Sequence, residues 1–255
     1  MKNLMVANWR EGARVSRGEL RALLDAQVEN SLALGWTPRD LMIVANFPYE
    51  YLGVQSQGVE ELNTHCLRGS KMFALDQLFK SGQIGTDDLI WAHDLDAWQN
   101  FWFAPPEFAD IGIAEYSQPK FNGGSVFVRY AAQDVVAQIV SRIVEKREDR
   151  EEPTINQVLR SLPHEERVTV LNSTYNLGCS GFRERFTRGS KPILVSHFHP
   201  TNKMAWDTHI NNRNGMGETT APRLVELLIR RFHRGIAPQK LPPSKKKKQC
   251  LDGTR

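Results

Sequence analysis

The chain is poor in cysteine and has no long hydrophobic run, and each absence excludes a class of protein. Its three cysteines, Cys66, Cys179 and Cys250, are scattered and odd in number, which argues against a disulfide framework. No apolar stretch approaches the roughly 18–20 residues that span a bilayer, and the first residues lack the hydrophobic segment of a signal peptide. We therefore expect a cytoplasmic protein without a membrane partner.

Charge is unevenly distributed along the chain. The formal net charge is +4 at pH 7, but residues 239–255 carry +5 and leave −1 on the rest. A basic tail on a near-neutral body is typical of proteins that bind polyanions, although a solvated terminus has the same composition. We predict one domain, residues 1–238, followed by a basic, disordered tail, residues 239–255.

Apolar strands and amphipathic helices alternate through the first hundred residues. Helices are predicted at residues 17–34, with Ser16 as N-cap, and 70–80, between strands at 3–9, 41–46 and 88–92. This order predicts an α/β protein with a parallel sheet. The second half is more mixed, with strands predicted at 121–128 and 192–196 and helices at 132–147, 154–162 and 222–234.

Polar residues follow the first and third predicted strands at the point where each strand ends. Asn8 and Trp9 follow the first, and His93, Asp94 and Asp96 follow the third. Ligands of open α/β sheets bind beyond the carboxyl ends of the strands, so these two clusters are expected to meet at one site.

Asp94-Leu95-Asp96 has the spacing of a pair of metal ligands. Side chains two residues apart point the same way in an extended chain, so both carboxylates can face one cation. Mg²⁺ and Mn²⁺ prefer oxygen ligands and keep positions open for substrate phosphates. Such a cation neutralises charge on a departing diphosphate. The alternative is a solvated turn with no ligand.

A second polar segment follows the predicted strand at 192–196. His197 and His199 lie on one side of an extended chain, and either can complete a metal shell, while Lys203 can reach a phosphate. A His-x-His pair more often indicates zinc, but no cysteine or third histidine lies nearby at ligand spacing. A polar loop of hydrogen-bonded histidines is the alternative.

Five short motifs in unbroken order, over roughly residues 1–210, carry a family resemblance. They are Lys71 ahead of Asp94-x-Asp96, Phe121-Asn122-Gly123-Gly124, Glu151-Glu152-Pro-Thr-Ile-Asn156, Leu171 to Tyr175-Asn176, and His197-Phe198 through Lys203 to Trp206. In these motifs the chain resembles the GT-A-fold glycosyltransferases, in particular the glycogenin-like retaining group. Among its departures, Glu151-Glu152 stands where that family has Asp-Gln, and Lys203 is followed by Met-Ala-Trp rather than Pro-Trp.

The resemblance implies a single GT-A (Rossmann-like) nucleotide-sugar-binding domain with a mainly parallel central sheet. It implies a metal-dependent glycosyltransferase that takes its sugar from a UDP-sugar-type donor. Asp94, Asp96 and His197 would bind Mn²⁺ or Mg²⁺. The residues expected at the donor's phosphates and sugar are Lys71, Lys203, Asn122, Gly123, Glu151 and Glu152.

The chemistry of such retaining enzymes assigns further roles. The acceptor hydroxyl attacks on the face from which the diphosphate leaves, so catalysis depends on positioning and on charge at the leaving group. Asp96 and either Glu151 or Glu152 are the expected catalytic residues, a glutamate steadying an oxocarbenium-like centre. A solvated acid in the first turn of a helix is the alternative. Trp9 would stack on the nucleotide base, or else belong to the core, and Asn8 would bond to the edge of the base.

The acceptor is indicated by a narrower resemblance. Val6-Ala-Asn-Trp-Arg10 and Asn46-Phe-Pro-Tyr-Glu-Tyr51 are similar to the DNA glycosyltransferases associated with TET/JBP oxygenases of phages and kinetoplastids. This implies hydroxymethylcytosine or hydroxymethyluracil in DNA as acceptor and the cytoplasm of a phage-infected host as location. Base flipping would give access, with Tyr49, Tyr51 or Phe182 stacking on the base or else part of the core.

Basic residues agree with a DNA partner, although a solvated amphipathic face has the same pattern. They are Arg183, Arg185, Arg188 and Lys191 in one segment and Arg223, Arg230, Arg231 and Arg234 in the last predicted helix. Two other functions stay open. One is a glycosyltransferase acting on a glycan, lipid or protein hydroxyl, and the other is a non-catalytic nucleic-acid-binding protein with a degenerate transferase fold.

Overall fold

A computed structural model describes residues 1–13, 15–58, 62, 70–117, 120–148, 150–163, 166–178 and 182–197. The predictions that concern His199, Lys203, the helix at 222–234 and the basic tail lie outside these residues. None of the helices in the described part of the chain combines the length and the apolar character that a membrane crossing requires.

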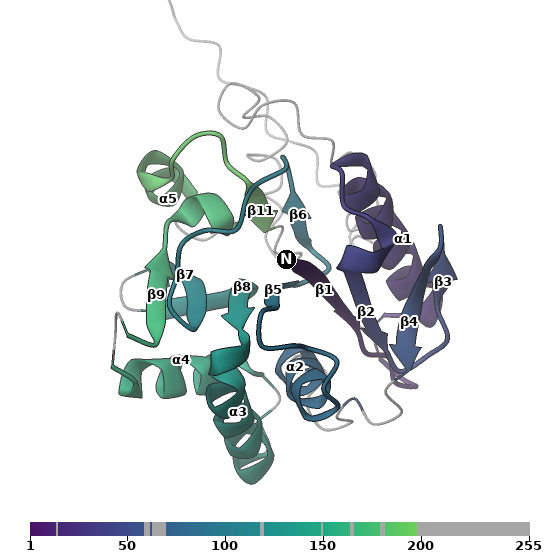
Figure 1. The fold of residues 1–255 in the computed structure, drawn as a ribbon, viewed down its shortest axis with the longest axis horizontal. Coiled ribbons are helices and arrows are strands. Elements are labelled where there is room, and N and C mark those ends of the chain that lie inside the picture. The colour runs from purple at the N-terminus through teal and green to yellow at the C-terminus, as the bar shows by residue number, and fades with distance from the viewer. Residues whose placement is uncertain are drawn as a thin grey trace, which may run out of the picture.

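An eight-stranded sheet forms the centre of the molecule, in the order β3-β4-β2-β1-β5-β8-β7-β9 (Figure 1). Its strands are β1 (Lys2–Ala7), β2 (Leu41–Ala45), β3 (Glu50–Tyr51), β4 (Val54–Gly58), β5 (Leu89–His93), β7 (Ile111–Ser117), β8 (Lys120–Arg129) and β9 (Val168–Leu171). The pairs β1–β2, β1–β5, β2–β4 and β7–β9 are parallel, and β8 is antiparallel to both β5 and β7. The predicted mainly parallel α/β sheet is confirmed.

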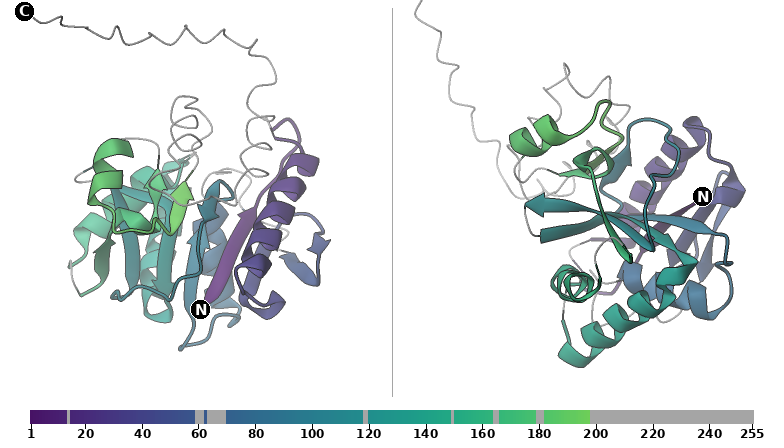
Figure 2. Two further views of the ribbon diagram at one scale, coloured as in Figure 1. Left: turned by 90° about the horizontal axis from the view of Figure 1, so that it is seen from above. Right: turned by 60° about the vertical axis from the view of Figure 1, so that its left-hand side comes forward.

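Helices cover both faces of this sheet (Figure 2). They are α1 (Arg17–Ala33), α2 (Ser70–Lys80), α3 (Gln133–Lys146) and α4 (Glu152–Ser161), with short 3-10 turns at Pro38–Asp40, Tyr130–Ala132 and Ser173–Tyr175. Ser16 caps α1 as predicted, in a capping box with Glu19.

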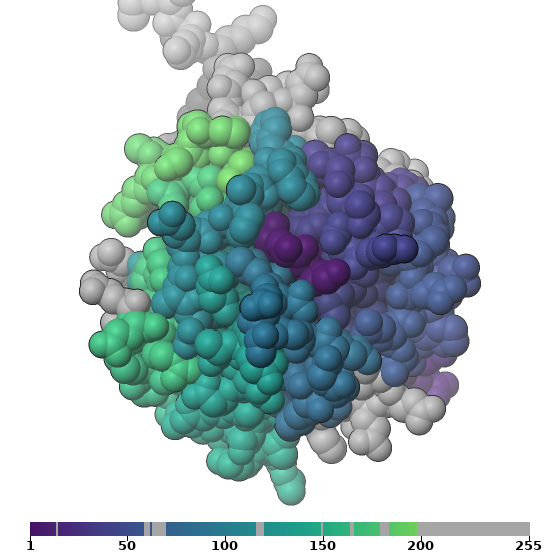
Figure 3. All heavy atoms as spheres, in the orientation of Figure 1, coloured from purple at the N-terminus to yellow at the C-terminus, as the bar shows by residue number. Residues whose placement is uncertain are grey.

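Successive side chains of a strand point to opposite faces, and this alternation divides the core into two layers. Ile90 belongs to the layer under α2, α3 and α4, whereas Trp91 belongs to the layer that α1 covers. Both side chains are fully buried, because the central strands are covered on both faces. The amino end of β1 reaches the surface near the middle of the face drawn in Figure 3.

A second, three-stranded sheet lies beyond the end of β5. It has the order β10-β11-β6, formed by β6 (Ala97–Gln99), β10 (Leu177–Gly178) and β11 (Val195–His197). In its register, His197 lies opposite Ala97 on β6 and opposite Gly178 on β10. A short helix, α5 (Phe182–Arg188), follows β10. This small sheet therefore brings the chain near residue 197 to the residues that follow β5.

Candidate metal and donor site

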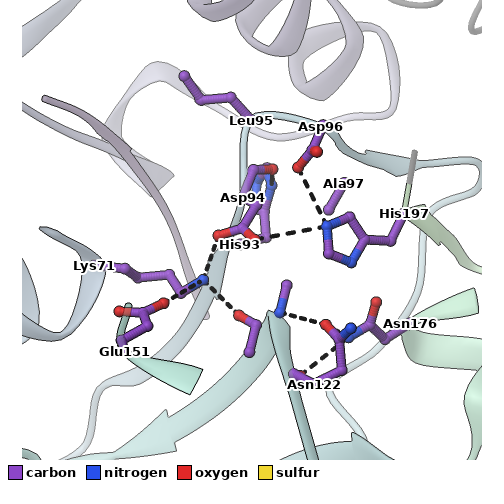
Figure 4. A network of polar contacts seen from close by, with 12 residues as sticks. Lys71, His93, Asp94, Leu95, Asp96, Ala97, Asn122, Glu151, Asn176 and His197 are labelled. Carbon is purple, nitrogen blue, oxygen red and sulfur yellow. Dashed lines mark hydrogen bonds and ion pairs between the residues drawn. The ribbon is translucent and has the colours of Figure 1, made fainter. Parts of the chain in front are cut away.

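Asp94, Asp96 and His197 lie together at the carboxyl end of β5, as the sequence predicted (Figure 4). Nε2 of His197 lies 3.2 Å from Oδ1 of Asp96 and 3.6 Å from Oδ2 of Asp94. The chain turns directly after the strand, with the Ala97 N–H donating to the Asp94 carbonyl at 2.9 Å. This turn places both carboxylates on the side from which the imidazole approaches.

The chemistry of this cluster fits a divalent cation. The three residues each offer one ligand atom, and these atoms lie within 4.8 Å of one another. Two carboxylates at such a distance repel each other, and a shared cation relieves that repulsion. Oxygen ligands suit Mg²⁺ and Mn²⁺, and an imidazole is also a ligand for transition metals. Asp94 and Asp96 are partly exposed, so one side of the cluster is open to a substrate.

Lys71, from the first turn of α2, reaches the other oxygen of Asp94. Its Nζ lies 2.5 Å from Oδ1 of Asp94, 2.5 Å from the carbonyl of Gly123 and 3.4 Å from Oε1 of Glu151. Burial lowers the pKa of Lys71, but the charges of Asp94 and Glu151 outweigh it and leave the pKa above its ordinary value. An ammonium has three N–H donors, and three protein oxygens surround this one.

The two adjacent glutamates have different surroundings. Glu151 is buried beside Lys71, and no described residue donates a hydrogen bond to its Oε2. Burial raises the pKa of Glu151 to about 7, against the pull of the Lys71 charge. Glu152 is instead partly exposed, with Oε1 lying 3.3 Å from Nζ of Lys120. Of the two, Glu151 is the one that contacts the lysine bound to Asp94.

Asn122 and Asn176 form a buried amide pair beneath the cluster (Figure 4). Nδ2 of Asn176 donates to Oδ1 of Asn122 at 2.9 Å and to its carbonyl at 3.2 Å. The guanidinium of Arg185, from α5, donates to the Asn176 carbonyl. Arg185 is only 5% exposed, so the prediction that it contacts DNA phosphates is wrong, because its charge is buried within the protein.

Asn8 and Trp9 lie at the same edge of the sheet as Asp94, because Met5 pairs with His93 in the parallel register. Nδ2 of Asn8 donates to Oγ of Ser70 at 2.8 Å, at the start of the helix that carries Lys71. The backbone of Trp9 pairs with the side chain of Asn46, which accepts from its N–H at 2.8 Å and donates to its carbonyl at 2.6 Å. The guanidinium of Arg17 lies 4.4 Å from the centre of the Trp9 ring.

His93 was expected to join this polar edge but is a buried neutral residue. Its Nε2 lies 2.8 Å from Oδ1 of Asn3 on β1, and its ring stacks on Trp91 with centroids 4.2 Å apart. Burial lowers the pKa of His93 to about 4, so the imidazole is uncharged at neutral pH. It joins β5 to β1 below the cluster.

Two of the aromatic residues predicted to stack on a base have other contacts. Tyr49 is 4% exposed and belongs to the core, with its hydroxyl donating to Asp25 at 3.1 Å, so of its two predicted alternatives the core is the one observed. The hydroxyl of Tyr51 donates to Glu29 at 2.5 Å. Phe182 has no described side chain.

Arg188 and Lys191 belong to the same predicted basic segment as Arg185 and also have contacts within the protein. In the predicted basic segment, Arg188 is exposed and forms an ion pair with Glu184 at 2.5 Å. Nζ of Lys191 donates to the Gly189 carbonyl at 2.9 Å. Arg183 has no described side chain.

No protein-family model matches the sequence, and no curated protein matches it either. Solved structures do match the fold. A glycosyltransferase involved in the glycosylation of the major capsid of PBCV-1 superposes with a TM-score of 0.51 at 14% identity, over 83% of this chain and 100% of that one. An active-site mutant of LgtC superposes with a TM-score of 0.52 at 14% identity, over 84% and 96%.

A third structure gives the same result over part of its length. The glycosyltransferase GlyE of Streptococcus pneumoniae TIGR4 superposes with a TM-score of 0.53 at 12% identity, over 79% of this chain and 56% of that one. Identities this low establish the fold alone. The chain therefore has the GT-A fold, the Rossmann-like α/β architecture of these glycosyltransferases, built on a mainly parallel central sheet.

Proposed function

We propose that the protein is a metal-dependent glycosyltransferase that moves a sugar from a UDP-sugar-type donor to a hydroxyl group. One observation carries this proposal. In a chain with the GT-A fold, two carboxylates and an imidazole converge at the carboxyl end of a central strand. That edge of an open α/β sheet is where ligands bind.

Asp94, Asp96 and His197 would hold Mn²⁺ or Mg²⁺. A bound cation supplies positive charge for the diphosphate as it leaves. Asp94 is held for this task by Lys71, whose ammonium fixes one carboxylate oxygen and leaves the other facing Asp96 and His197. Lys203, which lies outside the described residues, stays a prediction as a phosphate-binding residue.

Glu151 is the better of the two glutamates for a role at the donor sugar. Its Oε2 is buried without a described hydrogen-bond partner, and its Oε1 lies beside Lys71. A carboxylate here can accept from a sugar hydroxyl or steady positive charge at the anomeric carbon. Glu152 also has a buried oxygen, Oε1, but that oxygen is paired with Nζ of the exposed Lys120 at 3.3 Å. Asn122 and Gly123 lie on β8, where the Gly123 carbonyl accepts from Lys71. A retaining stereochemical outcome is what the family resemblance implies.

For the acceptor, we propose a hydroxymethylpyrimidine in DNA, on the strength of the narrower sequence resemblance. The two segments that carry it contact each other, because the Asn46 side chain bonds to both backbone groups of Trp9. They meet at the end of β1, at the edge of the sheet that holds Asp94. A glycan, lipid or protein hydroxyl is the competing acceptor.

Donor binding is tested by thermal unfolding with a panel of nucleotide sugars in the presence of Mn²⁺. A ligand that binds the native state raises the Tm by mass action, so a UDP-sugar should raise it in a Mn²⁺-dependent manner. Donor hydrolysis should also need Mn²⁺ and should be abolished in Asp96→Ala. A degenerate, non-catalytic protein would show neither the shift nor the hydrolysis.

The acceptor is tested separately with radiolabelled UDP-sugars. DNA that contains hydroxymethylcytosine or hydroxymethyluracil should acquire label, and the same DNA with unmodified pyrimidines should not. Label in glycan or protein acceptors, with none in either DNA, would contradict the DNA proposal and leave the glycosyltransferase proposal intact.

A further inference from the structure

The imidazole of His197 lies directly against the backbone of Gly124, a glycine of β8. A Cβ atom built at Gly124 would lie 2.0 Å from Cε1 and 2.1 Å from Nδ1 of His197, whereas ordinary contact begins at 3.4 Å. Any side chain at this position would therefore occupy the space of the ring. The φ angle of Gly124 lies outside the left-handed region, so space explains this glycine and backbone conformation does not.

Gly124 is also bonded to the other half of the cluster. Its carbonyl accepts from the Asp94 N–H at 2.9 Å, and its own N–H donates to Oδ1 of Asn122 at 2.7 Å. Asn122 is held in turn by the amide of Asn176. The strand is thus fixed relative to Asp94, and it cannot shift to make room for a larger residue without breaking these bonds.

We propose that Gly124 is the positioning residue for His197. Because it lacks a side chain, it allows the imidazole to approach Asp94 and Asp96 closely enough to share a cation with them. This inference deepens the proposed function and rests on the metal site described there. Gly124 bonds to Asp94 through its carbonyl, and the His197 ring lies where a side chain at Gly124 would be.

The neighbouring Gly123 provides a matched control. A Cβ at Gly123 would lie 3.4 Å from Cδ1 of Ile155 and 3.6 Å from Oε1 of Glu151, both ordinary contacts. The two glycines are adjacent on β8 and neither has a left-handed φ. The contact with His197 is therefore what distinguishes them. Gly123→Ala therefore controls for the addition of a methyl group when Mn²⁺ binding is measured without donor.

The test measures Mn²⁺ binding to the full chain, with the metal alone as probe. Affinity is obtained from an EPR titration of free Mn²⁺, and imidazole ligation from the ¹⁴N modulation in pulsed EPR. Gly124→Ala should weaken binding by about tenfold or more and remove the ¹⁴N signal, as His197→Ala should, because displaced ligands bind metals poorly. Gly123→Ala should retain both. Wild-type affinity together with the ¹⁴N signal in Gly124→Ala would overturn the inference.

Two further outcomes separate this inference from the proposed function. If His197→Ala leaves Mn²⁺ binding unchanged, the metal site itself fails and the inference fails with it. If His197→Ala weakens binding and Gly124→Ala does not, only the role of Gly124 fails. Should Gly124→Ala not fold, the double variant with His197→Ala decides, because removing the ring removes the clash. Recovered cooperative unfolding supports the inference, and continued failure to fold overturns it.

Discussion

The two oxygens of Asp94 face two regions that differ in burial and in charge. On the inner side, Oδ1 contacts Lys71, which is buried together with Glu151. On the outer side, Oδ2 faces His197 and the partly exposed Asp96. One carboxylate thus joins a buried ion-pair network to a group of candidate ligands in which His197 is buried and Asp96 is partly exposed. Changes on the inner side should therefore affect folding, and changes on the outer side should affect the response to metal.

The largest expected effect is that of Lys71→Met. It removes the cation between Asp94 and the buried Glu151, and an uncompensated buried charge is strongly destabilising. We expect the free energy of unfolding to fall by about 3 kcal/mol, the low end of the usual range, because Asp94 is partly exposed. Denaturant unfolding in metal-free buffer measures this. A loss of unfolding free energy below about 1 kcal/mol would mean that the inner ion-pair network does not stabilise the fold.

Next in size is a pH dependence that originates at Glu151. Its pKa in the folded protein is about 7, above the ordinary 4.5, so the folded state binds more protons between these values and stability falls as pH rises through them. His93 opposes this, because its pKa is lowered to about 4 and its contribution to stability falls as pH drops below its ordinary 6.5. A comparison with Glu151→Gln removes the shared His93 contribution.

Relative to the wild type, Glu151→Gln should gain about 2–3 kcal/mol in unfolding free energy as pH rises from about 5 to 7.5. The measurement is denaturant unfolding of both proteins at matched pH values, without metal. A constant difference across this range would show that Glu151 titrates at its ordinary pKa.

Asp96→Asn should have a small effect on stability and a clear effect on the response to metal. The change removes one of two neighbouring negative charges without emptying space, so the unfolding free energy without metal should stay within about 1 kcal/mol of wild type. The rise in Tm on adding Mn²⁺ should disappear, because a ligand has been lost. A loss of several kcal/mol without metal would place Asp96 with the inner region instead.

The smallest expected effect is that of Glu152→Gln. Its ion pair with Lys120 is partly exposed on both sides, and exposed pairs contribute about 0–1 kcal/mol. Stability should hardly change, in contrast to Glu151→Gln. An effect on sugar transfer as large as that of Glu151→Gln would mean that both glutamates contact the donor.

The parts of the fold that could be predicted from the sequence are those with a local signal. The strands at Lys2–Ala7 and Leu89–His93 are apolar runs that end in polar residues, and the helix at Arg17–Ala33 has both a periodic apolar face and a cap. No strand is predicted at β7, although Ile111 and Ile113 have the alternation of a strand. The pairing of β7 with β8 is interrupted by register shifts. β10 has two residues, too few to show a period, whereas β11 overlaps the end of the strand predicted at 192–196.

The residues of the site also divide into those that have a local sequence signal and those that do not. Asp94 and Asp96 follow a strand at the spacing of ligands, and the family resemblance pointed to His197. No local pattern shows that Glu151 contacts Lys71 while Glu152 contacts Lys120, because both contacts depend on how the start of α4 packs. The local sequence gives Arg185 the pattern of a surface cation. Its burial arises from the packing of α5 on β10, which no local pattern shows. The need for glycine at 124 depends on a side chain from a distant strand.

The pairing of β6 with β11 also has a consequence for how the protein is made. Both aspartates and β6 leave the ribosome about 100 residues before β11, the partner strand that carries His197. A nascent chain of intermediate length therefore holds the two aspartates of the proposed metal site without the imidazole of His197. If these residues hold a cation as proposed, the full set of ligands would come together only after β11 has paired with β6.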